Sequence, residues 1–409
     1  MFRKLLTFDD AKRAIEATFK PTFLGEEETV LLEAYNRVVS TDVVSPIDLP
    51  SSNTSNINGY AVLAEDTLGA EEEQPIKLRV VGCVGVGEGS KLKLNKGEAV
   101  EVAAGSVLPE GVNAIVPIDD CEREDDTLQV YTAVTSNDNL RRLGSDVKKG
   151  SIALKKGQVL GPSEIGILAA LGLTQVKVLR IPMVAVLSVG NDVCELSKTL
   201  TAGKTYDLNA YSLCAAVMEC GGKPVYFGVV PEEKESVLRV LRTAVASADM
   251  VVACGGEPNM TELTDSMGKP GIIVNGVAIK PGKSIAMAFV GEKPVVLLPN
   301  NPTVALLTYN LFARSLVQRL AGRPVSALKT LVAFSGSKMF SAKGSRTFVM
   351  VKLEFDRSCR LIAEPIEAAG IVSALAETDG FVEIGENQQF VELDKEVAVM
   401  LLRGSAGRV

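Results

Sequence analysis

Between residues 180 and 324 the sequence alternates short apolar runs with segments of helical periodicity, and this alternation constrains the fold more than any other feature. The runs MVAVLS, PVYFGVV, DMVVACGG and KPVVLLPNNP are almost continuously apolar. Helical patterns separate them, one of which follows Asp207 and stops at Gly221-Gly222. Apolar strands that alternate with helices form a parallel sheet covered on both faces. We therefore predict a doubly wound α/β domain, with its ligand site beyond the carboxyl ends of the strands.

The sequences on either side of this domain favour β structure. Between Pro75 and Tyr131, runs such as EAVEVAAG and AIVPID alternate with Gly, Pro and Asn, which is typical of a β-rich module. After Pro324, TFVMVKLEF and FVELDKEVAVMLL show the partial alternation of strands, and they predict a small barrel or sandwich. At roughly 150 residues per domain, the length suggests about three domains.

The absence of histidine limits the chemistry. Without any His in its 409 residues the chain has no Ser-His-Asp or Cys-His mechanism and no imidazole metal site. Acid–base work then falls to carboxylates, Lys, Tyr, Cys or solvent, and any metal is expected to be a hard cation on oxygen ligands.

Charge and hydropathy indicate the compartment and the partners. The net charge of -7 argues against binding to nucleic acid, and no apolar run is long enough to span a bilayer. The N-terminal segment indicates an amphipathic helix rather than a signal peptide, and the seven cysteines form no C-x-x-C pair. We therefore expect a cytoplasmic protein with reduced thiols.

Two segments of the α/β region suggest an anion site. Lys280-Pro281-Gly282-Lys283 brings two ammonium groups to one turn, and Gly255-Gly256 allows a backbone to approach a ligand and offer N–H groups. A phosphate site and a solvated turn with ordinary surface lysines fit this pattern equally well. In Pro299-Asn300-Asn301-Pro302, simple helix capping explains the Asn-Pro pair, although a helix start at a strand end also attracts anions.

Two loops outside the α/β region are less decisive. In RRLGSD, the two arginines could grip a phosphate while Asp146 meets a metal or another chain, or the group could be a surface ion-pair cluster. The uncharged loop SSNTSNINGYAV, from Ser51 to Val62, ends in Asn58-Gly59 and on local grounds is a surface turn.

The order of these segments resembles that of the molybdopterin molybdotransferase family, the MoeA-type molybdenum insertases, which include the C-terminal domain of gephyrin. The resemblance covers nearly the whole chain. It is carried by NGYAV, GEAVEVAAGSVLPEGVNAIVPID, RRLGSDVKKG, VLSVGNDV, YDLNAY, ACGG, KPGK, LPNNP, KGSRTF and ALAETDG.

The resemblance implies a multidomain α/β plus β fold and a homodimer with active sites between subunits. Its four domains would be an elongated dimerisation domain at 1–44 with 141–179, a β-rich insert at 45–140, a central α/β molybdopterin-binding domain at 180–324, and a C-terminal β-barrel at 325–409. It also implies a reaction in which adenylylated molybdopterin and molybdate give molybdenum cofactor and AMP, with Mg²⁺ assisting.

The resemblance further implies roles for single residues. The catalytic group would be Asp146, Asp192, Asn58 and Lys280, and the two acids among them would be the metal ligands. The substrate-binding group would be Ser188, Gly255, Gly256, Lys283, Pro299, Asn300, Pro302 and Arg346.

Several acids of the family pattern are amides here. Asn58 and Asn53 replace Asp in the loop before Tyr60, and Asn191 and Asn113 replace two more. Asn300 stands where the family has Gly. Amides keep polar contacts but lose the negative charge that holds Mg²⁺. We therefore keep two alternatives to the insertase: a non-catalytic or weakly active pterin-binding scaffold, which the amides favour, and a tungstate-handling variant. The retained KPGK motif favours catalysis, or at least binding.

Overall fold

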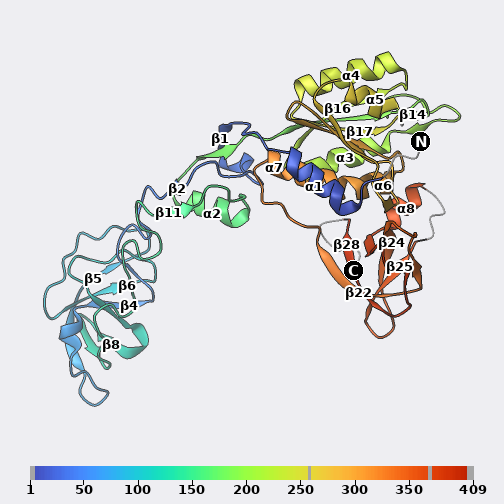
Figure 1. Cartoon of the computed structure of the whole chain (residues 1–409). Coiled ribbons are helices and arrows are strands. Elements are labelled where there is room, and N and C mark those ends of the chain that lie inside the picture. The colour runs from blue at the N-terminus through green and yellow to red at the C-terminus, as the bar shows by residue number, and fades with distance from the viewer. Residues whose placement is uncertain (1–4, 257–258, 367–370, 403–409) are drawn as a thin grey trace.

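The structure, a computed structural model, describes residues 5–256, 259–366 and 371–402. Figure 1 shows an elongated molecule with the α/β domain and a C-terminal barrel at one end, a β-rich insert at the other, and a narrow stalk between them. This arrangement confirms the predicted multidomain α/β plus β class. No helix among the described residues is long and apolar enough to cross a membrane.

The α/β domain is built on a six-stranded mixed sheet. Its first four strands are parallel, the fifth runs antiparallel to them, and the sixth runs antiparallel to the fifth. In spatial order the strands are β16 (Lys223–Val230), β13 (Met183–Val189), β17 (Met250–Gly255), β21 (Lys293–Leu298), β20 (Ala286–Val290) and β18 (Pro270–Asn275). The parallel part confirms the prediction from the apolar runs, and the antiparallel hairpin extends the sheet.

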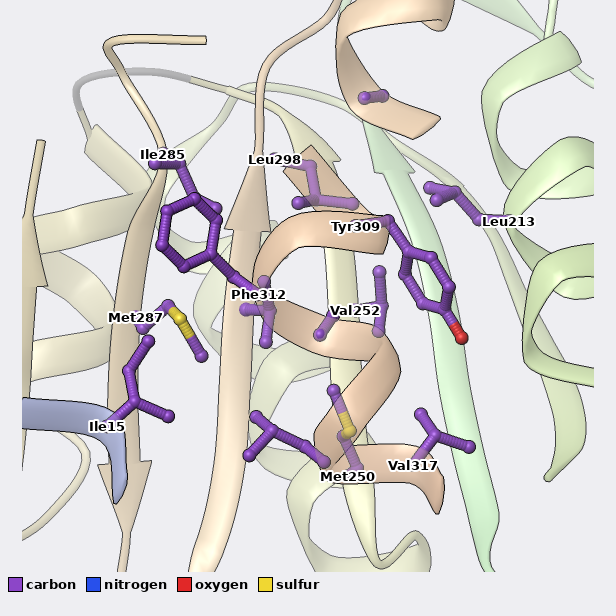
Figure 2. Close-up of a cluster of buried hydrophobic side chains, with 14 of the residues drawn as sticks. Ile15, Leu213, Met250, Val252, Ile285, Met287, Leu298, Tyr309, Phe312 and Val317 are labelled. Carbon is purple, nitrogen blue, oxygen red and sulfur yellow. The ribbon is translucent and has the colours of Figure 1, made fainter. Parts of the chain in front are cut away.

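Helices cover both faces of this sheet. One face carries α3 (Leu208–Glu219) and the continuous helical segment α6 (Pro302–Thr308), η4 (Tyr309–Ala313) and α7 (Arg314–Leu320), and the other carries α4 (Lys234–Ser247) and α5 (Asn259–Asp265). Val186 and Val252 face the first core, where Figure 2 shows Phe312 and Tyr309, whereas Leu187 faces the second. Because both faces are buried, the strands are apolar without alternation.

The N-terminal helix α1 (Phe8–Thr18) packs on the same α/β core. Thr7 caps it by accepting from the backbone N–H of Asp10 at 3.1 Å, and Ile15 points into the cluster shown in Figure 2. Phe8 contacts the rings of Phe312 and Phe348, so α1 also reaches the C-terminal barrel. The helix therefore lies apart from the stalk, although it falls within the predicted 1–44 segment; the domain limits stay a prediction.

The stalk is a ribbon that the chain crosses twice. Outward and returning segments pair in three short antiparallel ladders: β1 (Glu26–Val30) with β12 (Gln175–Leu179), β2 (Val43–Val44) with β11 (Ile152–Leu154), and β3 (Thr54–Ser55) with β10 (Leu140–Arg141). The turn η1 (Leu31–Glu33) and helix α2 (Pro162–Ala170) lie beside it, and Val39, Leu160 and Leu168 form its small core.

The insert is a six-stranded sheet with apolar clusters on both faces. Tyr60 and Val62 face one cluster and Ala61 faces the other, which is the alternation of a strand. In spatial order the strands are β7 (Ala114–Pro117), β4 (Gly59–Val62), β6 (Glu98–Val102), β5 (Ile76–Val84), β9 (Thr127–Val130) and β8 (Cys121–Glu124), with turns η2 (Ala64–Thr67) and η3 (Ile118–Asp120).

The C-terminal domain is a closed five-stranded barrel, as predicted. Its strands follow the order β24 (Arg346–Phe355), β25 (Leu361–Pro365), β22 (Thr330–Ser335), β28 (Glu396–Leu401) and β26 (Gly380–Ile384), and β26 pairs back with β24. A small ladder of β23 (Met339–Phe340) with β27 (Phe390–Val391) and helix α8 (Ile371–Glu377) complete it. The α/β domain adds β19 (Ile279–Lys280) to β24 in parallel, which joins the two domains.

Candidate functional site

The carboxyl ends of three neighbouring strands define the candidate site. Ser188 on β13 lies opposite Cys254 on β17, which in turn lies opposite Leu298 on β21. The loops that follow these strands therefore meet at one edge of the sheet. They carry the predicted residues Asp192, Gly255, Gly256, Pro299, Asn300 and Pro302, of which Asp192 and Asn300 are exposed.

The paired glycines have backbone conformations and surroundings that exclude a side chain. Gly255 and Gly256 have φ of +87° and +75°. A Cβ at Gly255 would overlap the carbonyl oxygen of Val189, and a Cβ at Gly256 would lie 2.7 Å from the Cγ of Met260. Glycine is therefore required for the chain to leave β17 close to β13. Gly255 is buried at this point and Gly256 is partly exposed.

A buried hydrogen-bond network lies beneath the site. The Ser188 hydroxyl donates to Oδ1 of Asp207 at 2.7 Å, and the Tyr226 hydroxyl donates to Oδ2 at 2.9 Å. Asp207 also caps α3 by accepting from the N–H of Ala210 at 3.1 Å. Burial, and then the carboxylate of Asp207, raise the pKa of Tyr226 above its usual range. From the sequence, Asp207 was recognisable only as a helix start, and Tyr226 had no local signal.

An amide bridge fixes the loop after β21. Nδ2 of Asn209 on α3 donates to the carbonyl oxygen of Asn300 at 2.7 Å. Asn301 caps α6 by accepting from the N–H of Val304 at 3.2 Å, and Pro302 occupies the first turn, so the capping interpretation is confirmed. Among the described residues, Oδ1 of Asn209 and Oγ1 of Thr303 are buried without a hydrogen-bond partner.

The lysine turn packs against the side of α6. Gly282 has φ of +105°, and a Cβ there would lie 2.5 Å from Cγ2 of Thr308 and 3.5 Å from Cγ1 of Val304. Lys280 and Lys283 on either side of it are exposed. Two ammonium groups are thus held by one tight turn against the helix that begins at the candidate site.

The predicted residues of the insert and stalk form a second group. Oδ1 of Asn58 accepts from the N–H of Ala104 at 2.8 Å, and Oδ1 of Asn53 accepts from the N–H of Leu143 at 2.8 Å. Asp146 is exposed nearby, with its N–H bonded to Leu49. A carboxylate would accept the same N–H groups, so each amide preserves the contact and removes a charge. Figure 1 places β4, which begins directly after Asn58, at the far end of the molecule from the α/β domain, so the insert loop and the lysine turn lie far apart in one protomer.

A magnesium site is not assembled within one protomer. Asp192 lies in the loop after β13 of the α/β domain, Asp146 lies between β10 and β11 of the stalk, and both are exposed. In the part of the chain that the structure describes, no three Cys, Asp or Glu side chains come together as metal ligands. These residues do not by themselves fit a Mg²⁺ ion.

Arg346 opens β24 beside the lysine turn, but acidic side chains surround its guanidinium. Nε donates to Glu386 at 3.0 Å and Nη2 to Asp9 at 3.0 Å, and Glu383 lies 3.3 Å from Nη1. The hydrogen bond from Arg346 lowers the pKa of Glu386 below its ordinary value.

Together these features define a multidomain protein whose α/β domain carries a glycine pair and a lysine turn, with a β-rich insert on a stalk and a C-terminal barrel. Residues 6–172 match the MoeA N-terminal region (domains I and II), residues 185–319 a probable molybdopterin binding domain, and residues 333–402 the MoeA C-terminal region (domain IV). The chain belongs to the MoeA family.

Individual relatives agree over almost the full length. A putative molybdopterin biosynthesis protein of Methanocaldococcus jannaschii is 32% identical over 393 residues, covering 92% of each chain. Molybdopterin molybdenumtransferase 2 of Mycobacterium tuberculosis is 29% identical over 366 residues, covering 87% of this chain and 90% of its own. The crystal structure of a MoeA protein from Pyrococcus horikoshii superposes with a TM-score of 0.88 at 35% identity, covering 98% of this chain and 100% of that one. The predicted family and fold are thereby confirmed.

Proposed function

We propose that the chain is a molybdopterin molybdotransferase that inserts molybdate into adenylylated molybdopterin and releases AMP. The observation that carries the proposal is that the exposed Lys280 and Lys283 flank a turn packed on α6, the helix that begins in the loop after β21. Relatives that share most of the chain are named molybdopterin molybdenumtransferase. None of the seven cysteines forms a disulfide, which suits a reducing compartment, and we place the protein in the cytoplasm.

Each residue of the α/β group has a task in this reaction. Lys280 and Lys283 bind the negative oxygens of the substrate through charge-assisted hydrogen bonds, with Lys280 nearest the reacting centre. The glycine pair lets the ligand lie against the main chain, with Pro299, Asn300 and Pro302 beside it. Ser188 completes the floor of the site, where Asp207 fixes its hydroxyl.

We propose that the working unit is a homodimer in which the insert of one protomer covers the α/β site of the other. Two observations support it. The site residues fall into two groups that one protomer holds apart, and the stalk exposes apolar side chains, among them Leu32 at 94%, Tyr35 at 62% and Ile152 at 52%. In such a dimer Asn58 and Asp146 of one chain would meet Lys280 of the other.

A pterin-binding homologue with little or no turnover is the second candidate. Asn53 and Asn58 favour it, because both already accept backbone N–H groups and neither brings a negative charge. Ligand binding depends on the lysines and would survive this change, whereas recruitment of Mg²⁺ would not.

Single-turnover release of AMP from adenylylated molybdopterin tests the proposal. We expect release that depends on added molybdate, with tungstate and Mg²⁺ varied in parallel to define the oxyanion and the metal requirement. Lys283→Ala should weaken substrate binding roughly ten- to a hundredfold, since it removes a charge-assisted contact. Tight binding without AMP release would favour the second candidate. No binding by the wild type would limit the family membership to the fold.

A further inference from the structure

Arg346 and three carboxylates form a cluster between the N-terminal helix and the barrel. This Arg346 cluster comprises Arg346, Asp9, Glu383 and Glu386. The guanidinium makes contacts of 3.0 Å to Asp9, 3.3 Å to Glu383 and 3.0 Å to Glu386, and its face lies over the ring of Phe8 with 4.6 Å to the centroid. Only 17% of the arginine side chain is exposed. Both the edge and the face of the guanidinium are therefore occupied by protein groups.

The charge of the cluster is unsuited to holding an anion. Asp9, Glu383 and Glu386 contribute three negative side chains, against the positive charges of Arg346 and Lys12. The Nζ of Lys12 also lies over the Phe8 ring, 4.4 Å from its centroid. A phosphate or an oxyanion would have to displace carboxylates already bound to the guanidinium, and it would meet a net negative surrounding. These ion pairs therefore argue against direct contact between Arg346 and an anionic substrate.

Backbone hydrogen bonds connect Arg346 to the segment before the lysine turn, and that segment to the N-terminal segment. The N–H of Arg346 donates to the carbonyl oxygen of Ala278 at 3.0 Å, and the N–H of Ala278 donates to Leu6 at 2.8 Å. Ile279 and Lys280 then pair with Arg346 and Thr347 as β19 joins β24. Asp9 lies three residues after Leu6 and accepts a hydrogen bond from the Arg346 side chain, so the N-terminal segment contacts both the backbone before the lysine turn and the arginine.

We infer that Arg346 is a positioning residue, and that the Arg346 cluster fixes β19 so that Lys280 and Lys283 face the substrate. The inference rests on the proposed function for the identity of the ligand. Two supports hold the lysine turn: Gly282 packs on α6, and β19 is clamped by β24. Asp9 contributes to the second support without itself belonging to the turn, which makes it the most informative residue to change.

The test uses the full-length protein, four variants and one control variant. Asp9→Asn and Arg346→Lys weaken the ion pairs of the Arg346 cluster. Lys280→Ala removes one of the lysines that the cluster is proposed to position. The double variant combines Asp9→Asn with Lys280→Ala. Asp394→Asn is the matched control, since Asp394 binds Arg360 at 2.9 Å on the same barrel and its removal leaves β19 untouched. Hydrogen exchange over residues 279–284 is measured without ligand, and the dissociation constant for adenylylated molybdopterin is measured for each protein.

We expect faster exchange over residues 279–284 in Asp9→Asn and Arg346→Lys, with no change in the control. Substrate affinity should fall about three- to tenfold in both variants. In the Lys280→Ala background, Asp9→Asn should cost less affinity than it does in the wild type, because one of the two positioned lysines is already gone.

Two results would overturn the inference. One is unchanged exchange in Asp9→Asn. The other is weaker binding in Arg346→Lys together with equal or tighter binding in Asp9→Asn, as expected if removing an acid freed an arginine that contacts the anion itself. A wild type that fails to bind adenylylated molybdopterin would instead defeat the proposed function, and the exchange data would still decide the positioning role.

Discussion

Ser188 and Asp207 are joined by a 2.7 Å hydrogen bond between buried side chains, which couples the carboxyl end of β13 to the start of α3. Asp207 accepts two further hydrogen bonds, from Ala210 and Tyr226. Asp207→Ala leaves these donors unpaired and removes the cap, so we expect a loss of about 2–4 kcal/mol in the free energy of unfolding. Tyr226→Phe, which removes a single bond, should cost less. Urea denaturation of both variants checks the order, and equal costs would contradict it.

Gly255→Ala should destabilise the α/β domain more than an alanine at a glycine with a similar φ in open space. The added Cβ would overlap the carbonyl oxygen of Val189, whereas at Gly291, with φ of +62°, no atom lies within 4 Å. We expect a loss of more than about 3 kcal/mol for Gly255→Ala and about 1 kcal/mol for Gly291→Ala. Thermal unfolding of the two variants makes the comparison. Similar melting temperatures would show that β17 and β13 separate at little cost.

The cysteines should differ in reactivity with pH. Burial and nearby Asp207 raise the pKa of Cys214 to about 11, and burial and Asp120 raise that of Cys121 to about 12. At pH 8 such thiols are about one part in a thousand thiolate or less, so the exposed Cys83 and Cys359 should be alkylated first. The labelling of Cys214 should rise about tenfold per pH unit between pH 8 and 10. Mass spectrometry after timed quenching gives the order, and early labelling of Cys214 would refute it.

Mixed dimers test the shared site. Lys280→Ala and Asp146→Ala each remove one half of the proposed site, and a dimer of one chain of each variant keeps one intact site. Random pairing should therefore restore about one quarter of the wild-type rate of AMP release. Each variant alone should be nearly inactive. Failure of the mixture to exceed the separate variants, with mixed dimers verified by tagged purification, would mean that the site lies within one chain.

Asn58→Asp restores a charge without removing a contact. Asp accepts the N–H of Ala104 as Asn58 does, so the fold should be unchanged. The added carboxylate should raise the affinity for Mg²⁺ and the rate of AMP release, with substrate affinity nearly constant. Calorimetric titration of Mg²⁺ and of substrate separates the effects. Asn58→Gln is the control, and a wild type with tight Mg²⁺ dependence that Asn58→Asp leaves unchanged would contradict the importance of the lost charge.

The sequence was most informative where burial acts on both sides of a strand. MVAVLS and DMVVACGG could be predicted as parallel strands because their two faces enter different cores, and parallel strands bring their carboxyl ends together, which located Ser188 and Gly255. The hairpin of β20 and β18 was not predictable, since pairing direction depends on neighbours distant in sequence. An amphipathic pattern showed that α1 buries one face but not which core receives it.

The site itself was only half predictable for the same reason. Turn chemistry marks Gly256, Gly282 and Pro302 locally, through φ values and capping. The partners of Asp207, Asn209 and Arg346 come from other elements, and only the folded chain brings them together. The amides Asn53 and Asn58 were visible as substitutions, whereas their backbone donors were not.

The double crossing of the stalk limits how the insert can move. A module tethered by a single segment can swivel freely about it, but twisting this ribbon would shear the hydrogen bonds between β1 and β12 and between β2 and β11. Bending across the thin direction of the ribbon strains them far less. We therefore expect the insert to move mainly by bending of the stalk and little by twisting about its axis. Such bending would change the distance of Asn58 and Asp146 from a facing surface but not which residues face it.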